Sequence, residues 1–245
     1  MSNEILVIGE SCRDIFVYCD CARLCPDIPV PVLHIINQSD NAGMAKNVQR
    51  NILSLGSKCD IVTNEDWYNV TKTRYVHNET NHMFFRVDTD HHIPRINLDN
   101  IIYDYKIIVI SDYNKGFLTE EDIESVCSRH PNVFLDTKKQ LGGWAEKSKY
   151  IKINKFEYER SKNNLTPLLE SKIIHTKGGD GCAFYGKNYK VNKIEVRDTS
   201  GCGDTFLAGM VIEYFKTEDI EKSILFANLC ASEVAKHRGV TTVNL

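Results

Sequence analysis

The sequence predicts an α/β fold, in which a mostly parallel sheet is covered by helices and a small β excursion lies beside it. Three observations support this. Apolar strand-like runs alternate with helical segments after Tyr105, an apolar run over residues 4–9 ends in glycine, and two helical stretches close the chain. With 245 residues and 42% apolar side chains, the chain can bury one substantial core. We therefore expect a single domain over residues 1–245.

The first part of the chain predicts strands and one helix. Residues 4–9 are typical of a buried strand that delivers its carboxyl end to a loop. Short β-rich pieces around three prolines within residues 15–36 favour a β excursion rather than core. From Ala45, apolar residues recur at helical spacing, and Gly56 is placed to end that helix. Further strands are predicted at 59–63, 73–76 and 83–87.

The later part predicts regular alternation. Strands are expected at 107–110, 133–135, 150–153 and 172–175. Helices are expected from Thr119, near Glu157, over 202–215 and from 220 to about 236. This alternation implies right-handed crossovers between parallel strands, with helices covering the sheet.

Composition excludes several classes of partner. A net charge of -3 gives no excess of positive field, so nucleic acid is not expected as a partner. No apolar run approaches the ~20 residues that span a membrane, and no basic segment precedes the first apolar stretch.

Nine cysteines lie mostly inside apolar patterns, as reduced thiols do, which predicts a cytoplasmic protein. Cys19, Cys21 and Cys25 lack a second ligand pair at zinc-site spacing, so plain thiols are favoured.

The segment D-T-S-G-C-G-D-T over residues 198–205, directly before a predicted helix, carries the clearest chemistry. Backbone N–H groups of Gly201, Cys202 and Gly203 can turn toward a ligand at the helix start, where the helix dipole favours an anion. Asp204, in the first turn, can accept a proton beside this anion hole. A base and an anion hole suit phosphoryl transfer to an alcohol. The plainer alternative is a glycine turn with a capping aspartate.

This segment resembles the D-T-x-G-A-G-D signature of the ribokinase-like, or PfkB, carbohydrate kinase family, with Cys202 in place of alanine. Other family-like motifs occur in the family's order. They are a sugar-binding Gly43-x-Ala45-x-Asn47, a magnesium-associated Asn154-x-x-Glu157 and a nucleotide loop Thr176-x-Gly178-x-x-Gly181. The resemblance implies a ribokinase-like three-layer sandwich that uses ATP and Mg²⁺ to phosphorylate a sugar or sugar phosphate.

The resemblance also implies roles for individual residues. Asp204 would deprotonate the acceptor hydroxyl, while Asp14, Gly43 and Asn47 would bind the sugar. Glu157 would contact Mg²⁺, through water, and Asn228 would line the nucleotide together with the Thr176 loop. The β segments at about 15–36 and 73–87 would form a lid over the sugar, and such a lid implies a homodimer.

Shorter motifs resemble one subgroup, the heptose-7-phosphate kinase domain of ADP-heptose biosynthesis. They are Pro29-Val30-Pro31-Val32, Thr73-Arg74, Arg86-Val87-Asp88 and Ser111-Asp112-Tyr113-x-Lys115-Gly116. The subgroup resemblance implies that Arg74, Arg86 or Lys115 holds a phosphate already on the substrate. Ordinary solvated strand charge is the alternative for both arginines.

Several positions depart from the family pattern. Met44 stands where the family has a second glycine and Lys46 where it has a small residue, and we expect both to crowd or recharge the sugar pocket. D-P-K-G appears as D-T-K-K over residues 136–139. The connection between Thr63 and Thr71 is several tens of residues shorter, which predicts loss of a helix and a strand at the sheet edge. Two alternatives therefore stay open: a binding or regulatory protein of this fold, and a nucleoside or vitamin kinase.

Overall fold

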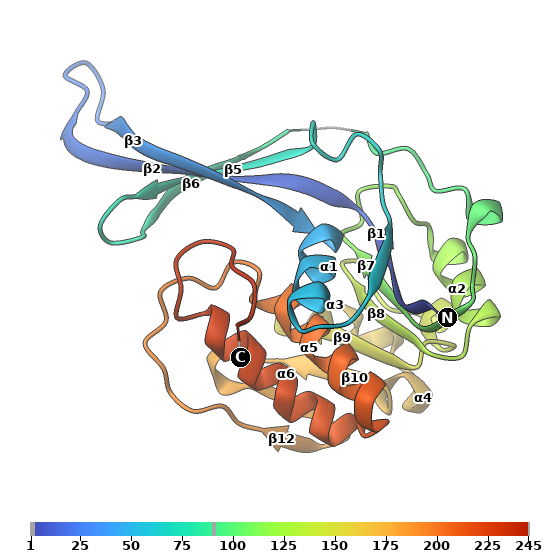
Figure 1. Ribbon diagram of the computed structural model, residues 1–245. Coiled ribbons are helices and arrows are strands. Elements are labelled where there is room, and N and C mark those ends of the chain that lie inside the picture. The colour runs from blue at the N-terminus through green and yellow to red at the C-terminus, as the bar shows by residue number, and fades with distance from the viewer. Residues whose placement is uncertain (1–2, 90–91, 245) are drawn as a thin grey trace.

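A computed structural model describes residues 3–89 and 92–244. These residues form a main sheet of eight strands in the order β12-β11-β10-β9-β8-β7-β1-β4 (Figure 1). The six strands from β10 to β4 are parallel, and β11 and β12 are antiparallel. The strands are β1 (Asn3–Gly9), β4 (Cys59–Val62), β7 (Tyr105–Asp112), β8 (Val133–Thr137), β9 (Tyr150–Asn154), β10 (Ile173–Thr176), β11 (Cys182–Phe184) and β12 (Lys187–Tyr189). The predicted mostly parallel α/β sheet is confirmed.

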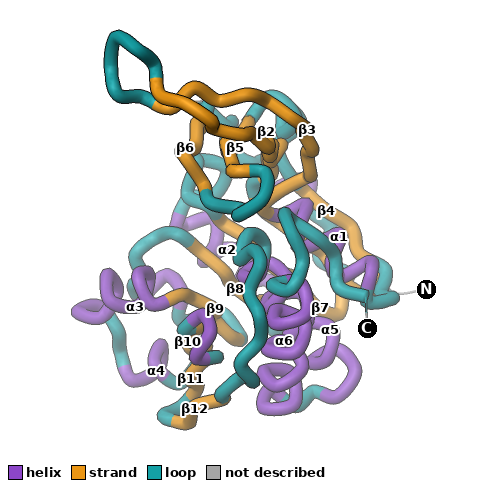
Figure 2. The backbone as a smooth tube through the Cα atoms, turned by 90° about the vertical axis from the view of Figure 1, so that its left-hand side faces the viewer, coloured by secondary structure: helices purple, strands orange, loops and turns teal. Residues whose placement is uncertain are grey.

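Helices cover both faces of this sheet and complete three layers (Figure 2). One face packs on α1 (Ala45–Ser54), α5 (Cys202–Thr217) and α6 (Ile220–Val234), and the other on α2 (Glu120–Arg129), α3 (Lys155–Ser161) and α4 (Pro167–Glu170). Short 3-10 turns are η1 (Leu98–Asn100), η2 (Gly143–Ala145), η3 (Lys162–Asn164) and η4 (Gly178–Asp180). Within the described ranges, no helix has both the length and the apolar character needed to cross a membrane.

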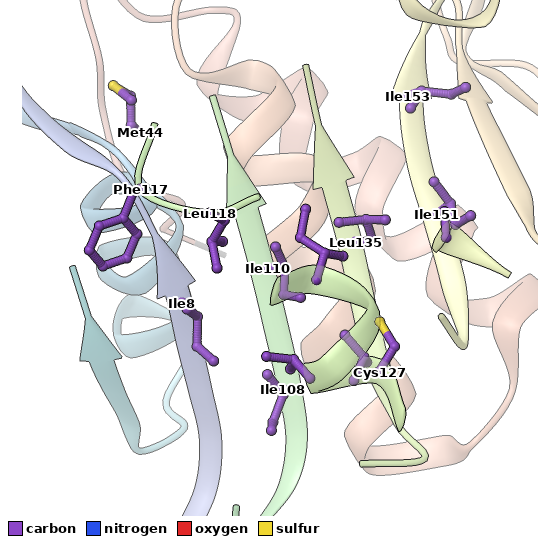
Figure 3. Close-up of a cluster of buried hydrophobic side chains, with 14 of the residues drawn as sticks. Ile8, Met44, Ile108, Ile110, Phe117, Leu118, Cys127, Leu135, Ile151 and Ile153 are labelled. Atoms are coloured by element: carbon purple, nitrogen blue, oxygen red, sulfur yellow. The ribbon is translucent and has the colours of Figure 1, made fainter. Parts of the chain in front are cut away.

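Alternation along the central strands explains the two cores. On β7, Ile108 and Ile110 are buried on the α2 side, whereas Ile107 and Val109 are buried against α1 and α5. Because successive strand residues point to opposite faces, a strand buried on both sides must be apolar at nearly every position. Figure 3 shows part of the core on the α2 side. Helix α2 begins with a capping box between Thr119 and Asp122, which fixes the predicted start.

A second sheet, here called the small sheet, has the order β3-β2-β5-β6 and projects from the body (Figures 1 and 2). Its strands are β2 (Ser11–Leu24), β3 (Pro31–Met44), β5 (Thr71–His77) and β6 (Met83–Asp88). The β excursion is confirmed, and it extends beyond the predicted pieces at 15–36 and 73–87. Strand β3 continues to Met44 because it pairs with β2 up to Ser11.

The chain passes from β4 to β5 through residues 63–70, which contain no helix or strand. This is the short connection that the sequence predicts, and β4 forms one edge of the main sheet. Asn64 ties the connection to the start of β2, because its side-chain oxygen accepts a hydrogen bond of 2.8 Å from the Ser11 backbone N–H. Thr63 adds a 2.7 Å hydrogen bond to the Ser11 hydroxyl.

Candidate active site

A pocket of about 780 Å³ opens where the parallel strands end at their carboxyl edge. Tyr113 follows β7, Lys138 follows β8, and Asn154 and Thr176 close β9 and β10. All four side chains line the pocket, together with the first turn of α5. The fold thus gathers residues that are far apart in the chain at one edge of the sheet.

Asp204 lies in the first turn of α5 and is 5% exposed. One carboxylate oxygen accepts a 2.7 Å hydrogen bond from the Tyr113 hydroxyl, and the other accepts a 2.9 Å bond from the Asn47 side-chain amide. Burial raises the pKa of Asp204, while these two hydrogen bonds oppose the rise. A buried, oriented carboxylate of raised basicity is suited to accept a proton.

The anion hole predicted at residues 201–203 lies directly beside this carboxylate. Gly201 is the N-cap of α5 with φ 79°, and a Cβ atom there would stand 2.9 Å from the Asn47 side-chain nitrogen. Glycine is therefore required both by the backbone and by the space. Gly203 and Cys202 also line the pocket, and burial raises the pKa of the Cys202 thiol to about 11. The thiol accordingly stays protonated at neutral pH.

The residues predicted to bind sugar are linked through the small sheet and α1. Asn47, on α1, is fully buried and hydrogen-bonds to Asp204. Gly43 packs so closely on β2 that an added Cβ atom would lie 3.3 Å from that of Asp14. Asp14 forms an ion pair with Arg74 of β5, and both side chains are largely buried. The sequence predicts that Asp14 contacts the sugar and that Arg74 contacts a phosphate on the same substrate, and the structure pairs these two side chains with each other.

Arg86 and Lys115 lie farther out. Arg86 is opposite Arg74 in the β5–β6 pairing, is half exposed, and pairs with Asp88 at 2.7 Å. Lys115 belongs to an exposed loop, and its backbone N–H donates a 2.8 Å hydrogen bond to the buried Glu10. Neither is among the described residues that line the pocket. Their contact with a substrate phosphate stays a prediction.

The predicted nucleotide residues share one wall of the pocket, which contains Thr176, Gly178, Gly181 and Asn228. Gly181 has φ 83°, and a Cβ atom there would lie 2.0 Å from the Tyr189 carbonyl oxygen. Asn228, on α6, donates a 3.2 Å hydrogen bond to the same carbonyl. The glycine loop therefore turns tightly against β12, which leaves room beside it for a ligand.

Asn154 and Glu157 form the capping box of α3, with each side chain bonded to the other's backbone N–H. Glu157 is buried, and one of its oxygens also accepts bonds from the Asn154 amide at 2.8 Å and from the Lys138 ammonium at 2.6 Å. Little acceptor capacity remains on this carboxylate. Within residues 3–89 and 92–244, no group of three or more His, Cys, Asp or Glu side chains could hold a metal ion.

Sequence analysis gave no individual role to four polar residues of the pocket region: Tyr113, Asp136 and Lys138, which it named only within longer motifs, and Lys152, which it did not name. Lys152 pairs with Asp136 at 2.6 Å, and both are buried. Burial alone would lower the pKa of Lys138, but Asp136 and Glu157 raise it overall. The available signal was a single lysine inside the apolar run Y-I-K-I of residues 150–153.

Met44 and Lys46 are not among the described residues that line this pocket, and neither are Asp14, Gly43 and Asn47, so the effect of Met44 and Lys46 on a sugar pocket stays a prediction. Met44 takes a backbone conformation with φ 61°, and its side chain is buried in the core cluster that contains Ile8 and Phe117 (Figure 3). The Lys46 ammonium stands 4.7 Å from the centre of the Trp67 ring, a cation–π contact. Met44 is therefore part of the hydrophobic core, and Lys46 contacts an aromatic ring.

Comparison with known proteins extends these observations. The model of the family described as "pfkB family carbohydrate kinase" matches residues 108–245, more than half of the chain. A curated relative, "Bifunctional protein HldE" of Helicobacter acinonychis (strain Sheeba), is 27% identical over 301 residues that cover 99% of this chain. The chain spans 65% of that relative's length. Because the aligned region exceeds 245 residues, several tens of positions in the relative have no counterpart here.

Two solved structures share the fold. A ribokinase from Thermotoga maritima superposes with a TM-score of 0.76 and 16% identity, covering 97% of this chain and 94% of its own. A nucleoside kinase from Methanocaldococcus jannaschii superposes with a TM-score of 0.71 and 19% identity, covering 98% and 94%. The predicted ribokinase-like three-layer architecture is confirmed by these neighbours.

Proposed function

The chain belongs to the pfkB family of carbohydrate kinases, and from this premise we propose that it transfers the γ-phosphate of ATP to a hydroxyl group of a sugar or sugar phosphate. The observation that carries the proposal is the position of Asp204. Its buried carboxylate lies beside the backbone of Gly201 and Gly203 in a pocket large enough for a nucleotide. A base next to an anion hole is the arrangement that phosphoryl transfer to an alcohol needs.

In this mechanism, Asp204 takes the proton of the acceptor hydroxyl as its oxygen bonds to the γ-phosphorus and the bond to ADP breaks. Asn47 and Tyr113 hold the carboxylate in one orientation, since each donates a hydrogen bond to a different oxygen. The N–H groups at residues 201–203 face the charge on the transferred group. Because these donors are fixed before the reaction, they stabilise the transition state with little reorganisation.

ATP would lie along the wall of Thr176, Gly178, Gly181 and Asn228, all of which border the pocket. Mg²⁺ arrives as part of the Mg-ATP substrate. It keeps several waters and is held largely by phosphate oxygens, so it does not require a cluster of carboxylates. Glu157 already accepts three hydrogen bonds, which fits a contact through water better than direct coordination.

A phosphorylated acceptor, with heptose 7-phosphate as the first candidate, is the finer part of the proposal. Support comes from the subgroup motifs that contain Arg74, Arg86 and Lys115 and from the relatives named HldE. Arg74 and Arg86 are cross-strand neighbours on the small sheet, and Arg74 pairs with Asp14, a predicted sugar-binding residue. Arginine is suited to bidentate contacts with phosphate.

We propose that the small sheet is a lid over the sugar and also pairs two subunits in a homodimer. Several apolar side chains of this sheet are largely exposed, among them Ile35, Ile36, Met83, Phe85 and Val87. Exposed apolar side chains on one sheet favour a protein–protein contact.

Nine free cysteines support placement in the reducing cytoplasm.

The proposal is tested by measuring ADP release from ATP and Mg²⁺ with a panel of sugars, sugar phosphates, nucleosides and vitamin alcohols. The expected result is turnover that depends on a sugar or sugar phosphate, accompanied by a thermal shift with the same compound. Turnover with a nucleoside or vitamin alone would replace the proposed substrate class. Binding of sugars without turnover would instead support a binding or regulatory protein.

A further inference from the structure

Lys152 occupies an unusual place for a charged residue, in the middle of the parallel sheet. Its neighbours along β9, Ile151 and Ile153, point into the core on the α2 side (Figure 3). Because side chains alternate along a strand, Lys152 points to the opposite face, toward the start of α5. Its side chain is only 4% exposed. A buried ammonium is costly unless it has partners that compensate for lost water.

One partner is fixed by the strand register. Asp136 of β8 lies directly beside Lys152 of β9, and the Lys152 nitrogen is 2.6 Å from an Asp136 oxygen. On the other side, the β10 neighbour is Ile174, which is apolar. An ammonium group has three donors, and the one hydrogen bond seen for it among the described residues goes to Asp136. Two donors are therefore available to a ligand.

The anion hole is directly adjacent. A Cβ atom on Gly203 would stand 3.1 Å from the Lys152 nitrogen, so the ammonium lies against the backbone that forms the hole. Lys152 also lines the pocket with Asp204, and its charge acts to lower the pKa of that carboxylate. Lys138, the other lysine here, is 2.6 Å from Glu157 and 3.5 Å from Asp136. Lys138 is thus occupied by two carboxylates, whereas Lys152 faces the hole.

We propose that Lys152 is a catalytic residue that binds the transferred phosphoryl group, an inference that rests on the proposed kinase function. Its ammonium, oriented by Asp136, donates to a non-bridging oxygen of the γ-phosphate. The lysine keeps its proton throughout. The bond from phosphorus to the ADP oxygen breaks, the acceptor oxygen bonds to phosphorus, and the acceptor proton passes to Asp204. Lys152 thereby places a full positive charge where the backbone N–H groups of the hole supply only partial charges.

Three variants separate this role from that of a structural ion pair. Lys152→Met removes the charge and the 2.6 Å contact and leaves the buried Asp136 with only Lys138, 3.5 Å away, so it is expected to lower both stability and turnover. Lys152→Met combined with Asp136→Asn removes both charges and is expected to recover thermal stability. Turnover of the double variant should remain about 10²–10³-fold below the unmodified protein. Lys147→Met, at an exposed lysine paired with Glu124, is the control and should leave turnover unchanged.

Recovery of turnover in a stable double variant would overturn the proposal, since the pair would then be structural alone. A measurement without catalysis completes the test. Aluminium fluoride with ADP and Mg²⁺ mimics a phosphoryl group in transfer. We expect it to tighten ADP binding to the unmodified protein and to the Lys147 control, and to have no such effect in the double variant, whose affinity for ADP alone is retained. Equal tightening in the double variant would contradict the proposal. If no acceptor is phosphorylated, the kinase function fails, while the fluoride measurement still decides whether Lys152 binds such an anion.

Discussion

Arg74 and Arg86 face each other across two strands, yet the structure predicts very different consequences for their removal. Arg74 and its partner Asp14 have side chains 13% and 9% exposed, whereas Arg86 and Asp88 are 47% and 29% exposed. Arg74→Ala leaves a buried carboxylate without a counter-charge, which costs about 3–5 kcal/mol. Arg86→Ala breaks a surface pair that is worth about 0–1 kcal/mol.

Thermal and urea unfolding of the two variants measure this difference. For a chain of this size, the Arg74 variant should melt roughly 6–20 °C below the unmodified protein, and the Arg86 variant within a few degrees of it. Adding Asp14→Asn to Arg74→Ala should recover part of the loss, because the unpaired charge is removed. Equal melting temperatures for Arg74→Ala and Arg86→Ala would refute the reasoning. Each variant should also raise KM for a sugar phosphate by about 10- to 100-fold if its guanidinium binds that phosphate.

Three further predictions concern the pocket. Gly181→Ala should lower the free energy of unfolding by more than about 2 kcal/mol and weaken ATP binding, because φ is 83° and the new Cβ atom meets the Tyr189 carbonyl oxygen. Gly179 has open space around it, so Gly179→Ala should change that free energy by at most about 0.5 kcal/mol, and equal unfolding midpoints for the two variants would contradict this. Since burial raises the pKa of Cys202 to about 11, iodoacetamide at pH 8 should modify it far more slowly than it modifies a thiol of ordinary pKa, about 8.5. Mass spectrometry measures the two rates, and comparable rates would contradict the prediction. Burial also raises the pKa of Asp204, so its ionisation at neutral and alkaline pH disfavours folding, and Asp204→Asn should be more stable than the unmodified protein at pH 8. This advantage should disappear below about pH 4, where the carboxyl is protonated in the unfolded chain as well, and an advantage in urea unfolding that grew toward acid pH would contradict the prediction.

Local patterns in the sequence predict most of the helices and strands. The start of α2 follows from its capping residue Thr119, and the end of α1 from the glycine that follows it. The small sheet was harder to predict. Strand β3 runs through the polar stretch Asn37–Asn41 because those residues pair with β2, and pairing with a distant strand overrides local preference.

Sequence predicts the residues of the site only where they lie together in one short motif. Asp204 and its neighbouring glycines lie together in one segment, and the glycine loop at Thr176 does as well. Tyr113 contacts Asp204 across 91 positions of sequence, so only the strand order brings the two together. The Lys152–Asp136 pair likewise depends on β8 and β9 being neighbours. Local sequence marks Lys152 as unusual inside its apolar run, but it does not identify the partner of Lys152 or of Tyr113.

The central claim, that Asp204 is the base for phosphoryl transfer, is tested most directly by following the γ-phosphate of ATP onto the sugar or sugar phosphate that supports turnover. The account predicts that Asp204→Asn folds and binds ATP as the unmodified protein does, but transfers phosphate about 10²–10⁴-fold more slowly. Transfer by this variant within a few-fold of the unmodified rate would contradict the account.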